Sequence, residues 1–194
     1  MTPLVGRRAP DFTADAVWAD DGIRPFTLSD VRGRHAVLIF YPLDFSSACP
    51  SELLAFERSM PEFARRAVDL VACSIDSAHV HLAWKRTPCE QGGVGALSYP
   101  LVSDLTHEVV RAYGVEGVSG AALRATFVID REGVVQYQRV SNLGLALEVH
   151  ELLRVLDAVQ QGEVRPDGWQ EGRRGAALTE RGAAAYLAEH SDML

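Results

Sequence analysis

An uninterrupted apolar run, residues 36–40, stands directly before a short segment that carries Pro42, Ser46 and Cys49. A run that is apolar at every position and is followed by a proline-containing turn is typical of a buried strand. Residues 52–57, in contrast, are typical of the opening of a helix. We therefore expect the chain to turn from a buried strand into a helix, with Cys49 at the turn.

This position gives Cys49 a chemical character. Backbone N–H groups at the start of a helix are unpaired and carry partial positive charge, so they stabilise an anion such as a thiolate. Pro50 fits the first helical turn, where no N–H is needed, and Ser46 can turn its hydroxyl toward the sulfur. The alternative is a small, inert, buried cysteine. The convergence of a proline, a serine and a helix start on one sulfur favours a reactive thiol.

The same segment resembles the active-site motif of the peroxiredoxins, the thiol peroxidases. In that motif a proline, three residues, a threonine or serine, two residues and a cysteine follow one another, and Pro42, Ser46 and Cys49 fill those positions. The flanking residues are similar to the alkyl hydroperoxide reductase, or typical two-cysteine, branch. The resemblance covers nearly all of residues 5–190. It implies an α/β thioredoxin-like fold, a central mixed β-sheet flanked by helices, with a C-terminal extension.

Composition agrees with one ordinary globular domain, since the chain has 194 residues, 47% hydrophobic and 23% charged. A net charge of -7 argues against a nucleic-acid surface or an anionic membrane partner. No apolar run approaches the roughly 20 residues of a spanning helix, and no signal-peptide core is present, so we expect a cytoplasmic protein. The three cysteines include no Cys-x-x-Cys pair, which disfavours a disulfide framework, a zinc site and a thioredoxin-type exchanger. We expect no metal and no cofactor.

Apolar runs and helical periodicity alternate along the middle of the chain, which is typical of a sheet with helices on both faces. Strands are expected at residues 68–76, 99–104, 123–130 and 134–140, the last two forming a hairpin. Helices are expected at residues 78–86, capped by Ser77, and at 106–113, 145–161 and 176–190, and a turn at 18–23. We expect residues 1–161 to form the peroxiredoxin domain and residues 162–194 a C-terminal arm.

Two histidines, His79 and His81, fall in the helix expected at residues 78–86. They are not at the i, i+4 spacing of a helical metal site. Surface or packing roles are therefore expected for both.

Arg124 stands just before a predicted buried strand, where by position alone an ordinary surface charge is an equally good interpretation. The resemblance assigns it a role, because the family places its catalytic arginine at the start of this strand. It implies that Glu52 holds Arg124 in place, that Arg124 lowers the pKa of Cys49, and that Ser46 and Arg124 hydrogen-bond the peroxide oxygens. Pro42 would shield the thiolate from water. Cys49 would attack the hydroperoxide and become a sulfenic acid.

One departure from the family bears on how that sulfenic acid is reduced. Where the two-cysteine branch has Gly-Glu-Val-Cys-Pro after its long helix, this chain reads Gly162-Glu163-Val164-Arg165-Pro166, so Arg165 replaces the resolving cysteine. An external thiol reductant, of the thioredoxin, glutaredoxin or AhpF type, is therefore expected. Cys89, in a Gly-rich loop, is an internal candidate, and Cys73, inside a predicted strand, is a weaker one. A second departure, at residues 142–147, is the absence of an arginine that the family usually has there.

The resemblance thus implies an antioxidant enzyme that reduces hydrogen peroxide and organic hydroperoxides in cell redox homeostasis. It also implies a homodimer, with a decamer as a larger assembly. The alternative is a ring-forming, chaperone-like holdase or a peroxide sensor with weak turnover, because family members also form rings that hold unfolding proteins. The complete set of active-site residues favours the peroxidase; it comprises Pro42, Ser46, Cys49, Glu52 and Arg124.

Overall fold

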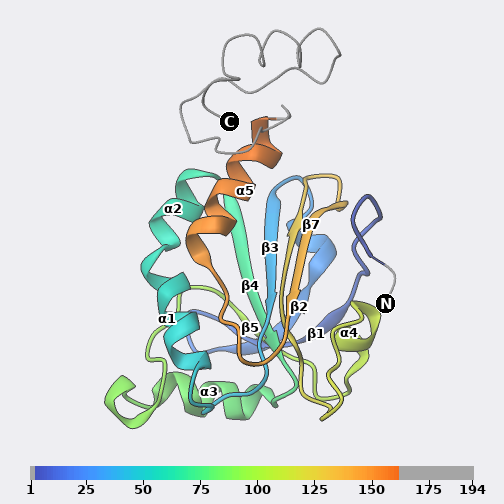
Figure 1. Ribbon diagram of the computed structural model, residues 1–194. Coiled ribbons are helices and arrows are strands. Elements are labelled where there is room, and N and C mark those ends of the chain that lie inside the picture. Colours follow the sequence, from blue (N-terminus) through green and yellow to red (C-terminus); the bar gives the residue numbers. More distant parts are fainter. Residues whose placement is uncertain (1–2, 162–194) are drawn as a thin grey trace, which may run out of the picture. The chain divides into compact units, whose positions relative to one another are not determined.

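The computed structural model describes residues 3–161, in which a mixed seven-stranded sheet has the order β2-β1-β5-β4-β3-β6-β7 (Figure 1). The strands are β1 (Thr13–Val17), β2 (Ile23–Thr27), β3 (His35–Phe40), β4 (Val68–Ser74), β5 (Leu101–Ser103), β6 (Arg124–Ile129) and β7 (Val135–Ser141). The α-helices are α1 (Cys49–Arg58), α2 (Met60–Arg65), α3 (Ala78–Arg86), α4 (Glu108–Ala112) and α5 (Val149–Gln161), and two 3₁₀ turns are η1 (Leu28–Val31) and η2 (Cys89–Gln91).

Strand β3 lies near the centre of the sheet and is buried at every position. Alternate side chains of a strand point to opposite faces, so a strand covered on both faces is apolar throughout. On one face Leu38 and Phe40 share a core cluster with Val110 of α4 and with Tyr113, which follows that helix. Figure 1 shows α1 and α2 on the opposite side of the sheet from α4. The apolar run that predicts a buried strand is therefore explained by helices on both faces.

The register of β3 brings two distant segments together at one end of the sheet. Strand β3 runs parallel to β4, with Phe40 opposite Cys73, and antiparallel to β6, with Phe40 opposite Ala125. The chain stays attached to the sheet for one more residue, because the Tyr41 N–H donates to the Cys73 carbonyl at 3.1 Å. The loop that leaves β3 and the first residue of β6, Arg124, consequently lie at the same end of the sheet.

Helix α1 begins at Cys49, and Pro50 occupies its first turn, as expected. Its buried residues Leu53 and Phe56 hold it against the core. Strand-to-helix turns and hairpins elsewhere also match the sequence prediction. Ser77, for example, caps α3 by accepting a hydrogen bond from the Val80 N–H.

Helix α5 begins at Val149, whereas the sequence pattern predicts a start at Leu145. The preceding residues form a loop, and the Leu147 N–H donates to the carboxylate of Glu52 at 3.1 Å instead of entering a helix. The chain separates into two units at Val149/His150. The division expected at residue 161 stays a prediction, and Arg165 and the helix expected at 176–190 lie outside the described residues.

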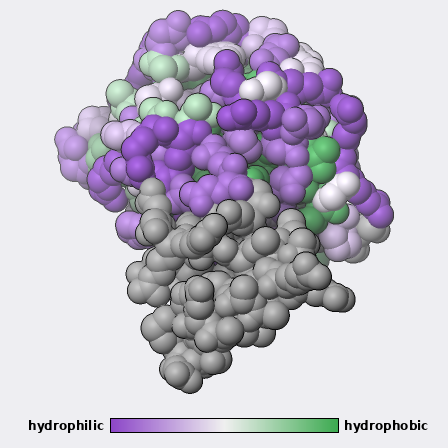
Figure 2. Space-filling model, turned by 90° about the horizontal axis from the view of Figure 1, so that it is seen from above, coloured by the Kyte–Doolittle hydropathy of each residue, from purple (hydrophilic) through white to green (hydrophobic). Residues whose placement is uncertain are grey.

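Seen from above, the surface of the described residues is mostly hydrophilic, with hydrophobic residues scattered among polar ones (Figure 2). Among the helices of residues 3–161, none combines the length and the apolar character needed to cross a bilayer.

The Gly-rich loop after η2 packs closely on the end of α3. The Gly93 N–H donates to the Pro88 carbonyl at 3.0 Å, and the buried Val94 donates to the Trp84 carbonyl at 3.3 Å. A Cβ atom on Gly93 would lie 1.8 Å from the Thr87 carbonyl oxygen, far inside contact distance. A side chain at position 93 therefore requires the backbone of Thr87 or of the loop to shift.

We expect Gly93→Ala to lower the free energy of unfolding by about 1–3 kcal/mol, because the backbone of Thr87 or of the loop must shift. Urea unfolding followed by circular dichroism measures the change. Gly144→Ala is the matched control, since a Cβ there meets nothing within 4 Å, and its change should stay within about 0.5 kcal/mol. Equal effects of the two substitutions would contradict the packing argument.

Candidate active site

The sulfur of Cys49 is the centre of the candidate site. Cys49 is the first residue of α1, forms no disulfide and has 0% of its surface exposed. The loop between β3 and α1 surrounds it, with Pro42 buried near the start of the loop and Ser46 half-buried near its end. The strand-to-helix turn predicted from the sequence therefore places this cysteine inside the protein, at a helix N-terminus.

Arg124 reaches the sulfur from β6. Its Nη2 lies 3.6 Å from Cys49 Sγ, its Nε donates to Glu52 Oε1 at 2.7 Å, and its Nη1 donates to the Leu143 carbonyl. The side chains of Arg124 and Glu52 are only 4% and 3% exposed. Each N–H-bearing nitrogen of this guanidinium thus meets an acceptor. The structure brings together the cysteine, the arginine and the glutamate that the sequence analysis singles out.

Glu52 joins the helix to the loop that follows β7. Its Oε1 accepts from Arg124 and from the Leu147 N–H, while its Oε2 is buried and has no hydrogen-bond partner in the described structure. The loop at residues 142–148 is thereby fastened to the ion pair twice, through the Leu143 carbonyl and the Leu147 N–H.

Ser46 lies next to Cys49. Its Oγ accepts a hydrogen bond from the Cys49 N–H at 3.4 Å. Hydrogen bonding by Ser46 and by the Leu43 backbone lowers the pKa of the Cys49 thiol. Donors at a sulfur stabilise its anionic form. Ser46, Leu43 and Arg124 therefore all favour a thiolate.

Burial nevertheless raises the pKa of the Cys49 thiol above its ordinary value and outweighs the lowering by Ser46, Leu43 and Arg124. Glu52 adds to the increase because it is a negative charge near the sulfur. The sequence-based expectation of a lowered pKa is wrong for this closed arrangement. It considers the helix start and the arginine but not the loss of hydration around a fully covered sulfur.

The other two cysteines differ in exposure. Cys73 lies in β4 with 0% exposure, and burial and Asp104 raise the pKa of its thiol well above the ordinary range. Cys89 is exposed and begins η2, near Gly95. No group of His, Cys, Asp and Glu within residues 3–161 is arranged to hold a metal ion.

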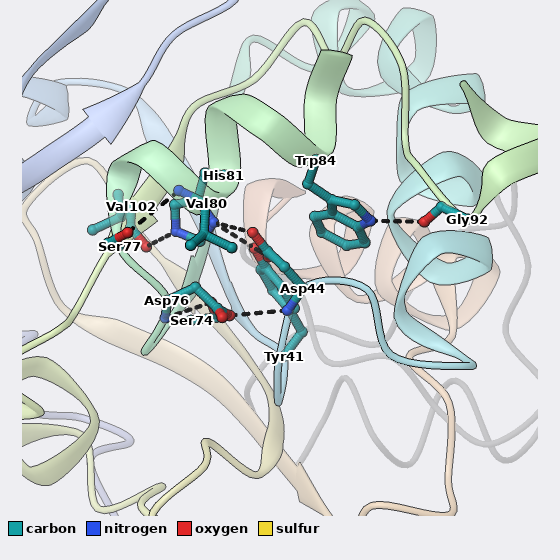
Figure 3. Close-up of polar contacts among 10 residues, drawn as sticks. All are labelled: Tyr41, Asp44, Ser74, Asp76, Ser77, Val80, His81, Trp84, Gly92 and Val102. Atoms are coloured by element: carbon teal, nitrogen blue, oxygen red, sulfur yellow. Dashed lines mark hydrogen bonds and ion pairs between the residues drawn. The ribbon is translucent and has the colours of Figure 1, made fainter. Parts of the chain in front are cut away.

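Sequence reasoning missed a buried polar network beneath the same loop (Figure 3). Asp44 accepts a hydrogen bond from the Tyr41 hydroxyl at 2.7 Å and contacts His81 Nδ1 at 2.7 Å. His81 is fully buried, whereas His79 on the same helix is exposed. A signal was present, because helical spacing puts His81 on the same face as Trp84 and one turn after Ser77.

Comparison with known proteins gives one consistent result. A family model described as the AhpC/TSA family matches residues 5–138. The chloroplastic 2-Cys peroxiredoxin BAS1 of Hordeum vulgare is 42% identical over 192 residues, which is 96% of this chain and 91% of that protein. Alkyl hydroperoxide reductase C of Helicobacter pylori is 39% identical over 194 residues, 97% of this chain and 98% of that protein. The crystal structure of reduced Plasmodium vivax 2-Cys peroxiredoxin matches with a TM-score of 0.94 at 40% identity, covering 96% of this chain and 100% of that chain.

The buried ion pair makes a stability prediction. Arg124→Met should lower the free energy of unfolding by about 3–5 kcal/mol, because it leaves the Glu52 carboxylate buried without its partner. The double variant Glu52→Gln/Arg124→Met should lose less than Arg124→Met alone, since no uncompensated charge remains. Urea unfolding of both variants measures the difference. A double variant at least as unstable as Arg124→Met would contradict this account.

Proposed function

The chain belongs to the AhpC/TSA family and is a peroxiredoxin, a thiol peroxidase with the thioredoxin-like fold, and from this premise we propose that Cys49 is its peroxidatic cysteine. The observation that carries the proposal is the approach of Arg124 Nη2 to Cys49 Sγ at 3.6 Å. A guanidinium beside a sulfur at a helix N-terminus is the setting in which a thiolate is nucleophilic.

In the proposed reaction, the Cys49 thiolate attacks the terminal oxygen of a hydroperoxide. An S–O bond forms while the O–O bond breaks, and the sulfur supplies the electron pair. The leaving alkoxide or hydroxide takes up a proton and departs as an alcohol or water, and Cys49 becomes a sulfenic acid. Arg124 and Ser46 stabilise the charge that develops on the leaving oxygen, Glu52 keeps Arg124 in position, and Pro42 limits access of water.

Access to the sulfur requires a local opening, because a residue with 0% exposure is not reached even by water. The covering loop includes the exposed side chains of Leu43 and Phe45. A shift of these residues would admit a peroxide. It would also hydrate the sulfur, which removes the burial that raises the pKa of Cys49 and leaves the influence of Ser46 and Arg124.

Regeneration is proposed to need an external thiol, on the proposal, drawn from the resemblance, that Arg165 replaces the resolving cysteine of the two-cysteine branch. Cys73 is a poor internal partner because it is fully buried, and the exposed Cys89 remains the internal alternative. We propose a thioredoxin-, glutaredoxin- or AhpF-type reductant. A homodimer, with a decamer as the larger assembly, and a cytoplasmic location stay part of the same proposal.

We expect Cys49→Ser to abolish peroxide consumption in excess dithiothreitol, because no other thiol lies beside Arg124. Cys73→Ser and Cys89→Ser are matched controls and should leave the first oxidation step within about twofold of the wild-type rate, since neither sulfur contributes to that step. Peroxide consumption at the wild-type rate by Cys49→Ser would refute the assignment. A wild-type protein that consumes none would instead favour the holdase or sensor alternative.

Intact-mass spectrometry after one equivalent of peroxide tests the regeneration step separately. We expect wild-type protein to gain one oxygen atom, as a sulfenic acid without a resolving partner does. Loss of two hydrogens would show an internal disulfide and overturn the requirement for an external thiol. Repeating the measurement on Cys89→Ser would then identify the second cysteine.

A further inference from the structure

A network of buried polar groups holds the first half of the loop between β3 and α1 (Figure 3). The Tyr41 hydroxyl donates to Asp44 Oδ1 at 2.7 Å, and His81 Nδ1 lies 2.7 Å from Asp44 Oδ2. The backbone N–H of Asp44 donates to Asp76 Oδ2 at 2.9 Å. Ser74 fixes Asp76 in turn, donating to the same oxygen at 2.7 Å. The loop is therefore tied to α3 and to the end of β4.

His81 is the link between this loop and the sheet. Its Nε2 lies 3.1 Å from the Val102 carbonyl, which can only accept, so Nε2 carries a hydrogen. Its Nδ1 and Asp44 Oδ2 hold a second hydrogen between them. With 0% exposure of its side chain, His81 has no water to replace either partner. Loss of one contact would leave a buried polar group unsatisfied, at a substantial cost.

The network ends at the sulfur. Asp44 lies two residues before Ser46, whose Oγ accepts a hydrogen bond from the Cys49 N–H at 3.4 Å. The exposed side chain of Leu43 does not anchor this part of the loop. The position of Ser46 beside Cys49 consequently depends on Asp44, which Tyr41 and His81 hold in place.

We propose that His81 is a positioning residue for Cys49: through Asp44 it fixes the loop that holds Ser46 beside the sulfur. The role rests on the proposed function of Cys49. It differs from simple packing because it acts through one of the two imidazole nitrogens. The contact of Nδ1 with Asp44 is required, whereas the contact of Nε2 with Val102 only anchors helix α3.

Two substitutions separate the two nitrogens. Asparagine places its amide nitrogen near the position of Nδ1 and can still donate to Asp44, whereas glutamine places it near Nε2 and can donate only to Val102. We expect His81→Gln to slow oxidation of Cys49 by hydrogen peroxide about 10- to 100-fold, the loss caused by a misplacement of about 1 Å. His81→Asn should restore the rate to within about threefold of wild type. His79→Gln, the same substitution at an exposed position of α3, should have no effect.

The pH profile of Cys49 alkylation, followed by peptide mass spectrometry so that Cys89 does not interfere, is the second readout. His81→Gln should move the profile to higher pH because a displaced Ser46 no longer stabilises the thiolate, and His81→Asn should not. Unchanged rate and profile in His81→Gln, or equal losses in both His81 variants, would overturn the proposal.

Two further measurements cover the cases in which His81→Gln does not fold or the wild-type protein does not react with peroxide. If circular dichroism shows that His81→Gln is unfolded, Tyr41→Phe replaces it, because it removes only the O–H donor to Asp44 and should shift rate and profile in the same direction; no shift would overturn the proposal. If wild-type protein does not react with peroxide, the function proposed for Cys49 fails, while the alkylation profiles still decide the role of His81.

Discussion

A buried guanidinium must satisfy several N–H groups at once, and Arg124 does so by joining three segments that are far apart in the chain. It contacts Glu52 in α1, the Leu143 carbonyl after β7, and the sulfur of Cys49. Burying two charges is costly, and only close pairing with good hydrogen bonds compensates that cost. Helix, loop and strand are therefore held in one arrangement, and that arrangement places the sulfur beside a positive charge.

The position of Arg124 depends in turn on the register of the sheet. Strand β6 pairs with β3 so that Leu38 faces Phe127, and both residues belong to one core cluster. A slip by one residue would turn every β6 side chain to the other face, burying Arg124 in an apolar layer and separating it from Glu52. The apolar core therefore specifies the geometry of the candidate site, although none of its residues reacts.

Residue patterns predict most of the fold, because buried strands and capped helices follow from local sequence; β3, the start of α1 and the Ser77 cap of α3 are examples. The pairing of Arg124 with Glu52 follows only from resemblance, because by position alone an ordinary surface charge is an equally good interpretation of Arg124. The Asp44–His81 contact is missed altogether. It joins residues 37 positions apart through a loop whose path no periodicity describes. For the same reason the late start of α5 is missed, since it depends on where the Leu147 N–H finds its acceptor.

The ionisation of Cys49 shows why a correct list of residues is not yet a mechanism. Arg124 lies 3.6 Å from the sulfur but only 2.7 Å from the opposite charge of Glu52, so the field at the sulfur is weaker than that of a lone guanidinium. Against this reduced attraction, complete burial raises the pKa of the thiol. Hydration of the sulfur would remove the increase caused by burial. Ser46 and Arg124 would then lower the pKa of the thiol, although no charge has moved. For the reaction proposed for Cys49, an opening wide enough to admit a peroxide would also admit water, so the same motion would let substrate in and favour the nucleophilic form.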